Sequence, residues 1–235
     1  MFIIIDGIDG SGKSTIINTW KEWLTTKSHK VFDLKKYLQE KNQYPTIEEV
    51  MPFDYIFSAE PTYTGVGKVI REEFIRTGTN YSNTTIAEAF SLDRLVSYNK
   101  MIIPLLTAGK CIIQDRSVTT SLIYHSTGEN PISMEKMLRL TGNKLAVKNR
   151  PDHLILVKTD PEIAFSRISS RTDKNDNAIF ERLSFMKKIS AKFFSNEFQQ
   201  IFSSRGSIIH HLNGNADFDT MKTESISLLK QILNQ

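Results

Sequence analysis

The strongest chemical signal in the sequence is a glycine-rich loop at residues 7–14. It reads Gly-Ile-Asp-Gly-Ser-Gly-Lys-Ser, which has the spacing G-x-x-x-x-G-K-[ST], and it stands between an apolar run at residues 2–5 and a segment with helical periodicity. In such a loop, backbone N–H groups curl around an anion, and the helix that follows adds further N–H groups and the positive end of its dipole. A plain turn between strand and helix is the alternative. Motif and context together favour a site for nucleotide phosphates.

The loop also indicates individual roles for its side chains. We expect Lys13 to reach the β- and γ-phosphates and the hydroxyl of Ser14 to bind Mg²⁺. Asp9 is unusual, because a carboxylate repels phosphate. It either faces a partner with donors, such as a sugar hydroxyl or the water shell of the metal, or points to solvent. The expected ATP-binding residues are Gly7, Ile8, Asp9, Gly10, Ser11, Gly12, Lys13, Ser14 and Thr15.

A second carboxylate, Asp115, follows the apolar run at residues 111–113, where a buried strand would meet solvent. In proteins with a phosphate loop an Asp at that place helps to hold Mg²⁺ or its waters, while an ordinary polar strand end is the alternative. Arginines are also available to neutralise the charge that develops in phosphoryl transfer, although helix faces carry arginines for solubility alone. The arginine candidates are Arg71, Arg94, Arg116, Arg167, Arg171 and Arg182.

Six short apolar segments, most of them separated by longer amphipathic stretches, predict the elements that position these residues. Strands that alternate with helices indicate an α/β fold in which helices cover both faces of a parallel sheet. Ligands of such sheets bind beyond the C-terminal strand ends. The strand candidates are residues 2–5, 31–34, 55–57, 111–113, 154–157 and 208–212; helices are expected at 84–107, from Pro161, at 177–202 and at 218–233. The polar stretch 171–177 is expected to form a mobile loop or lid.

Composition limits the classes of function. The 235 residues suit one domain, and 30 Lys and Arg against 26 Asp and Glu give a net charge of +4 without any basic run. We therefore expect phosphorylated small ligands rather than nucleic acid. Cys111 is the only cysteine, which excludes an intrachain disulfide framework. With no apolar run long enough for a membrane span and no signal-peptide pattern, the sequence predicts a soluble cytoplasmic protein without a membrane partner.

The order of these motifs resembles the thymidylate kinase family of P-loop nucleoside monophosphate kinases. The resemblance covers nearly the whole chain except residues 35–54, which look like an insertion. Within that segment, Thr46 and Glu49 have the spacing of a helix capping box. The matching segments are residues 2–15 (the opening strand and loop), 60–62 and 67–71 (the Glu-Pro loop and its helix), 90–94 (the segment that faces the base), 115–124 (the Asp-Arg motif), and 151–162 with Arg167 and Arg171 (the last core strand, its helix and the lid).

The resemblance implies a P-loop NTPase fold in one domain, residues 1–235, with a five-stranded parallel sheet and a short lid at about residues 168–178. It implies transfer of the γ-phosphoryl group of ATP to dTMP with Mg²⁺, in the biosynthesis of dTTP, and a homodimer.

Phe90 would stack on thymine and Arg94 would bond to its carbonyl edge. The other implied roles are Arg71 and Arg116 on the acceptor phosphate, Asp9 on the 3′-hydroxyl, Ser121, Tyr124 and His125 around base and sugar, Asp115 with Ser14 at the metal, and Glu60 near the reacting phosphates. The implied catalytic residues are Lys13, Asp9, Arg171, Arg167 and Glu60; because residues 7–14 contain no arginine, the lid would supply it through Arg171, with Arg167 secondary.

Several positions depart from the family pattern. Ala59 replaces an arginine before Glu60, Thr62-Tyr63 replaces a glycine pair, Ser117 replaces an aromatic residue, and His125 stands where a glutamine often reads the pyrimidine. These departures concern base selectivity more than the reaction. The alternatives are a kinase for another deoxynucleoside monophosphate, or a nucleotide-dependent switch without a small-molecule acceptor. The switch is disfavoured because the nearest approach to a guanine-reading Asn-Lys-x-Asp element, residues 143–146, lacks the Asp.

Overall fold

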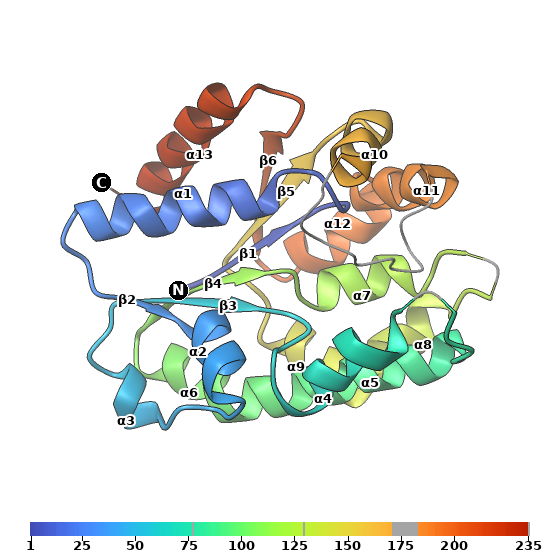
Figure 1. Ribbon diagram of the computed structural model, residues 1–235, viewed down its shortest axis with the longest axis horizontal. Coiled ribbons are helices and arrows are strands. Elements are labelled where there is room, and N and C mark those ends of the chain that lie inside the picture. The colour runs from blue at the N-terminus through green and yellow to red at the C-terminus, as the bar shows by residue number, and fades with distance from the viewer. Residues whose placement is uncertain (77, 129, 171–182, 235) are drawn as a thin grey trace.

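The computed structural model describes residues 1–76, 78–128, 130–170 and 183–234. Within these residues a parallel sheet, with strand order β2-β3-β4-β1-β5-β6, carries helices on both faces (Figure 1). The α/β prediction is confirmed, whereas the count of five strands is wrong, because the segments at both edges pair with the sheet and make six. The strands are β1 (Phe2–Asp6), β2 (Val31–Asp33), β3 (Tyr55–Ala59), β4 (Cys111–Asp115), β5 (His153–Lys158) and β6 (Ile208–Asn213).

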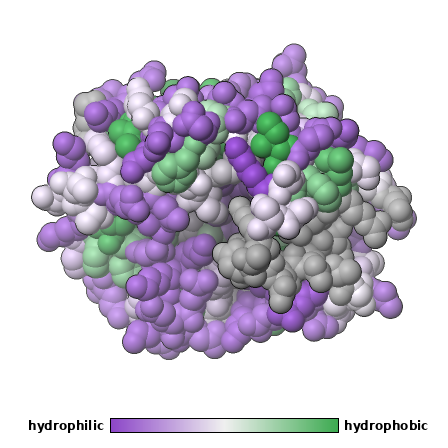
Figure 2. Space-filling view, turned by 45° about the horizontal axis from the view of Figure 1, so that its top comes forward, coloured by the Kyte–Doolittle hydropathy of each residue, from purple (hydrophilic) through white to green (hydrophobic). Residues whose placement is uncertain are grey.

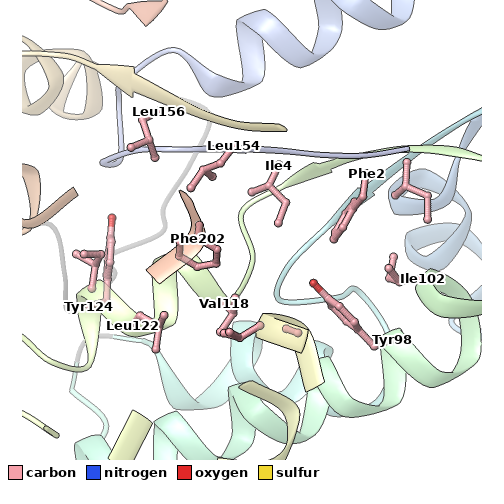
Figure 3. Close-up of a cluster of buried hydrophobic side chains, with 14 of the residues drawn as sticks. Phe2, Ile4, Tyr98, Ile102, Val118, Leu122, Tyr124, Leu154, Leu156 and Phe202 are labelled. Carbon is pink, nitrogen blue, oxygen red and sulfur yellow. The ribbon is translucent and has the colours of Figure 1, made fainter. Parts of the chain in front are cut away.

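Alternation along β1 divides the core in two. Successive side chains of a strand point to opposite faces, so Ile3 and Ile5 join the layer under α1 (Lys13–Thr26) and α13 (Phe218–Leu233), while Phe2 and Ile4 join the layer on the opposite face (Figure 3). That layer includes residues from α5 (Asn83–Ser97) and α7 (Val118–Tyr124). The remaining helices are α2 (Leu34–Lys41), α3 (Ile47–Val50), α4 (Gly65–Val69), η1 (Ile70–Phe74), η2 (Tyr98–Ile102), α6 (Ile103–Thr107), α8 (Met134–Arg139), α9 (Thr141–Lys148), α10 (Pro161–Ser169), α11 (Leu183–Phe193) and α12 (Asn196–Ser203).

The long helix expected at residues 84–107 is present, but it is not a uniform α-helix. α5 continues through the π-helical turn η2 into α6. Pro104 lies in the first turn of α6; it has no N–H to donate four residues back, and its ring collides with that carbonyl. The wider π-helical turn η2 lies directly before α6. Hydrophobic periodicity therefore located the helix and not its change in winding.

The segment at residues 35–54 folds onto the domain through α2 and α3. The predicted capping box is confirmed, because Thr46 Oγ1 accepts from Glu49 N at 3.3 Å and Glu49 Oε2 accepts from Thr46 N at 2.7 Å. Leu38 and Val50 are buried in the core and attach the segment to the sheet. Whether it is an insertion relative to the family stays a prediction.

The helical run expected at residues 177–202 is divided. α11 ends at Phe193, and the side chain of Ser195 accepts from Phe198 N at 3.4 Å to cap α12. This serine side chain offers the backbone a start for a second helix. The helices expected from Pro161 and at 218–233 are α10 and α13. Residues 177–182 lie outside the described residues.

The register of the strands brings the candidate residues to one edge of the sheet. Asp115 of β4 pairs with β1 on one side and with Ala59 of β3 on the other. Because the strands are parallel, loop 7–14, Glu60 and Arg116 all follow the C-terminal strand ends. The face in Figure 2 is largely hydrophilic with scattered apolar patches. In the part of the chain that the structure describes, none of the helices has the length and apolar character needed to cross a membrane.

Candidate active site

The glycine-rich loop is a tight cradle between β1 and α1. Gly10 has a φ of 74°, and a Cβ added there would lie 2.3 Å from the carbonyl oxygen of Ala164 in α10, so this position requires glycine. α1 begins at Lys13, within the last two residues of the loop, and no side-chain hydrogen bond caps its N-terminus. The N–H groups of its first turn can therefore donate to an anion.

Lys13 is folded back into this cradle. Its Nζ donates to Gly7 O at 3.0 Å and to Ile8 O at 2.7 Å, and the residue is 6% exposed. Burial, together with repulsion from Arg116, lowers the pKa of Lys13 to about 8. An anion that enters the cradle would favour the charged lysine, so the geometry suits a phosphate group.

Asp6, Asp9, Arg116 and Tyr124 gather beside the loop, and we call them the phosphate-side cluster. Arg116 NH2 lies 2.5 Å from Asp9 Oδ1, and Tyr124 OH donates to Asp9 Oδ2 at 3.0 Å. The side chain of Arg116 is 16% exposed and that of Asp9 is 37% exposed, so water and ligands can reach the pair. Burial disfavours the charged carboxylate of Asp9, but Arg116 and Lys13 outweigh it and hold its pKa below the ordinary value.

The role of Asp6 was missed in the sequence, where its place between a strand and the loop was the available signal. Its buried carboxylate accepts from Gly7 N at 2.7 Å, from Thr119 Oγ1 at 2.5 Å and from Thr120 Oγ1 at 2.7 Å. Burial raises the pKa of Asp6, against the attraction of Arg116 and Lys13. Asp6 thus fastens the first residue of the loop to α7.

Ser14 and Asp115 carry oxygens of the kind that Mg²⁺ prefers. Asp115 Oδ1 is buried and has no hydrogen-bond partner among the residues that the structure describes, which is unfavourable for a carboxylate oxygen unless a ligand completes it. Ser14 is exposed at the second position of α1. Proteins commonly hold Mg²⁺ through one or two of their own oxygens together with substrate phosphates and waters.

A second ion pair lies deeper, between Arg94 of α5 and Glu60. Arg94 Nε and NH2 lie 2.8 Å and 2.7 Å from Glu60 Oε2, NH2 also donates to Ser121 Oγ at 3.0 Å, and NH1 donates to Asn143 Oδ1 of α9. We call Glu60, Arg94, Ser121 and Asn143 the buried ion-pair cluster. These contacts use four of the five N–H groups of Arg94, whose side chain is 1% exposed. Burial raises the pKa of Glu60 to about 7 against the attraction of Arg94.

Arg71 lies against the loop that follows Glu60. Its Nε donates to Pro61 O at 3.0 Å and to Thr62 O at 3.2 Å, and its guanidinium carbon lies 3.8 Å from the centroid of the Tyr63 ring. Burial lowers the pKa of Arg71; Tyr63, Asp115 and Arg116 also act on it. Arg71 is thus within electrostatic reach of the phosphate-side cluster.

Phe90 and His125 contact each other edge to face, with ring centroids 5.4 Å apart. Asn83 determines which ring nitrogen of His125 carries the proton. Because Asn83 Nδ2 donates to the carbonyls of His125 and Asn130, its Oδ1 must accept from His125 Nδ1, 2.7 Å away. Burial, with the repulsion of Arg94, lowers the pKa of His125 to about 3. The ring is therefore neutral at physiological pH and its Nε2 is an acceptor.

Of the two arginines expected to supply charge from the lid region, Arg167 lies among the described residues and Arg171 does not. Arg167 of α10 is half-buried and NH1 donates to Gly214 O at 2.7 Å, on the loop that follows β6. That loop touches the glycine-rich cradle, since a Cβ on Gly214 would lie 2.6 Å from Ser11 O. Arg171, Arg182 and most of the expected lid lie outside the described residues.

A model of the thymidylate kinase family matches residues 36–203, which is more than half of the chain. The chain belongs to the thymidylate kinase family. It is 28% identical to a probable thymidylate kinase of Thermococcus kodakarensis over the full length of both chains, and 31% identical to that of Thermococcus onnurineus over 80% of this chain and 79% of the relative. A thymidylate kinase of Caldicellulosiruptor saccharolyticus is 27% identical over 80% of this chain and 78% of its own.

Within this member of the thymidylate kinase family, the structure brings the predicted residues together as two groups. One holds the glycine-rich loop, Asp115 and the phosphate-side cluster; the other holds the buried ion-pair cluster. Sequence reasoning missed the structural roles of Asn83 and Asn143, because each contacts a partner more than forty residues away in the chain. Their contacts exist only once α5, α7 and α9 pack together.

Proposed function

We propose that this chain transfers the γ-phosphoryl group of ATP to dTMP, giving ADP and dTDP. The observation that carries this proposal is the phosphate cradle with Lys13, beside an Arg116–Asp9 pair that a second phosphate can separate, in a chain of the thymidylate kinase family. Of the relatives named above, two carry the name probable thymidylate kinase and one the name thymidylate kinase.

On the donor side, the loop N–H groups and Lys13 hold the ATP phosphates. Ser14 and Asp115 would hold Mg²⁺, which supplies positive charge to the phosphate oxygens when bound. A phosphate oxygen of dTMP forms the new bond to the γ-phosphorus while the bond to the β-γ bridging oxygen breaks, and that oxygen leaves on ADP. The protein contributes position and charge rather than covalent chemistry.

On the acceptor side, Arg116 is the residue that we expect to change partners. Its ion pair with Asp9 is partly exposed, and a monophosphate dianion is a stronger partner than one carboxylate. Once Arg116 turns to the phosphate, Asp9 can accept a hydrogen bond from the sugar 3′-hydroxyl. Arg71 is the second cation proposed for this phosphate.

For the base, Phe90 offers a ring face, and the ring of His125 lies edge to face with it. Arg94 is proposed, from the family resemblance, to donate to the carbonyl edge of thymine or uracil, where cytosine presents an amino donor instead. A buried polar group left unpaired is penalised strongly, so dCMP should be rejected. One methyl group is worth about 1–3 kcal/mol in an apolar pocket, so dUMP should be only moderately worse than dTMP.

Lid closure is proposed to bring Arg171 to the reacting phosphates, with Arg167 secondary. The support is the absence of arginine from residues 7–14 and the position of Arg167 beside the cradle. A homodimer also remains a proposal from family resemblance.

A coupled assay of ADP release with ATP, Mg²⁺ and one acceptor at a time tests the proposal. We expect kcat/KM to be highest for dTMP, moderately lower for dUMP, and at least a hundredfold lower for dCMP, on the order of the discrimination that an unpaired polar group gives; dGMP serves as the purine comparison. A preference for another nucleotide would leave a kinase with a different acceptor. ADP release that needs no acceptor would instead favour a nucleotide-dependent switch.

A further inference from the structure

We propose that Lys35, in the first turn of α2, is a further cation of the acceptor-phosphate site, held beside Arg71 by the ring of Tyr63. This inference rests on the proposed function, since it assigns Lys35 to the phosphate of the nucleotide that accepts the phosphoryl group. It also gives a role to part of the 35–54 segment, for which the sequence indicates none.

The fold places Lys35 at the edge of the sheet that carries the site. β2 is parallel to β3, with Asp33 opposite Phe57, so α2 starts on the same side as Glu60 and the loop after it. The carboxylate of Asp33 fixes this start, because Oδ1 accepts from Lys36 N at 3.0 Å and Oδ2 lies 2.5 Å from Lys21 Nζ. Side chains in a first helical turn lean toward the helix N-terminus, which here means toward that edge.

Two cations share the ring of Tyr63. The guanidinium carbon of Arg71 lies 3.8 Å from the ring centroid and Lys35 Nζ lies 5.4 Å from it. Each contact is a cation–π interaction. Both cations thus lie at the ring of Tyr63, where an anion would be attracted by two positive charges.

Acidic groups near Lys35 do not neutralise it. Among the residues that the structure describes, no ion pair forms at Lys35, although it is half-buried, whereas its neighbour Lys36 is 69% exposed and lies 3.7 Å from Glu40. A half-buried ammonium without a carboxylate is an arrangement that a ligand phosphate would complete. Arg71 also donates to the carbonyl of Pro61, directly after Glu60, so both cations lie at the loop that follows β3.

The 35–54 segment is held to the loop that follows Glu60, and this contact keeps Lys35 in place. Thr64 Oγ1 donates to the carbonyl of Asn42, the C-cap of α2, at 2.8 Å. Leu34 and Leu38 are buried in the core. Lys35 thus sits on a rigid helix whose two ends are both tied, the start to Lys21 and the end to the loop after Glu60.

Kinetics of Lys35→Met and its matched control Lys36→Met test the inference, because Met keeps the apolar stem and removes the charge. We expect Lys35→Met to raise KM for dTMP about tenfold, the loss of one charge-assisted contact, with kcat and KM for ATP within twofold of wild type. Lys35→Arg should recover most of the loss, and Lys36→Met should change nothing. The tenfold difference should shrink at 1 M salt, where charges are screened within about 3 Å.

Calorimetry separates phosphate binding from packing. Lys35→Met should weaken binding of dTMP about tenfold and leave binding of thymidine, which lacks the phosphate, unchanged. Equal loss for both ligands, or no loss for either, would overturn the role of Lys35. If wild type phosphorylated no nucleoside monophosphate at all, the proposed function would fail, whereas an active wild type with an unaffected Lys35→Met removes only this inference.

Discussion

Arg94 and Arg116 both pair with a carboxylate at the same edge of the sheet, and their surroundings differ in one respect that decides what each can do. Arg116 in the phosphate-side cluster is 16% exposed and its partner Asp9 is 37% exposed. Arg94 and Glu60 are 1% and 3% exposed, and Ser121 and Asn143 use further donors of Arg94. A partly exposed pair can exchange partners with a ligand, whereas a buried pair is expensive to separate.

Two arginines suggested by the same kind of sequence signal can therefore have different roles, one in binding and one in holding the fold together. Arg116 also has a φ of 63°, a conformation that is costly for a residue with a side chain and that often marks functional sites. Arg94 joins α5 and α9 to the loop after β3. Its expected bond to the thymine carbonyl stays a prediction, and the contacts among the residues that the structure describes use four of its five N–H groups.

The largest effect is expected on stability when the buried pair is broken. Arg94→Met leaves Glu60 without its cation in the interior, which costs about 3–5 kcal/mol. Urea denaturation should show this loss, while the matched control Arg139→Met, which removes a 76% exposed arginine paired with Glu135, should unfold like wild type. If Arg94→Met were as stable as the control, the Arg94–Glu60 pair would not be stabilising the fold.

A loss of turnover without a loss of stability is expected on the phosphate side. Lys13→Ala should lower kcat by about a hundredfold to a thousandfold, because it removes charge that faces the transferring phosphate. The melting temperature should stay close to that of wild type, since the ammonium packs against loop carbonyls and not against the core. Lys27→Ala, at the exposed end of α1, is the control. Near-normal turnover of Lys13→Ala would remove the phosphate cradle from the proposal.

A smaller effect should appear in the pH dependence of stability. The pKa of Glu60 is raised from 4.5 to about 7, so between these values the folded protein keeps a proton that the unfolded chain has released. Stability should therefore fall by about 1–3 kcal/mol as pH rises from about 4.5 to 7, and this contribution should be constant above that range. Glu60→Gln should have a flatter profile over the same range, with a residual slope from Asp6. Identical slopes in both proteins would show that Glu60 titrates normally.

The glycine-rich loop and Asp115 could be predicted from the sequence because their signal is local. Residues 7–14 carry the motif in consecutive positions, and the positions of Lys13, Ser14 and Asp115 follow from the strand that precedes each loop. The six apolar segments likewise located all six strands, although the family resemblance led to a count of five. Short-range capping signals behaved in the same way, as the Thr46–Glu49 box shows.

The buried ion-pair cluster and the contact of His125 with Asn83 could not be predicted to the same depth, because their contacts join distant segments. Arg94 meets Glu60 and Asn143, which are 34 and 49 residues away, and His125 meets Asn83 across 42 residues. The residue types were recognised, but the burial that raises the pKa of Glu60 and the Asn83 contact that sets the tautomer of His125 arise only from packing. The π turn before Pro104 escaped prediction for a related reason, since periodicity does not report helical winding.

A crystal structure of the protein with dTMP tests the central contrast most directly. We expect the Arg116 guanidinium to leave Asp9 and bind the monophosphate, Asp9 to face the 3′-hydroxyl, and Arg94 to stay within hydrogen-bond distance of Glu60. A complex in which Arg94 has turned away from Glu60 to the base, while Arg116 still pairs with Asp9, would contradict this expectation.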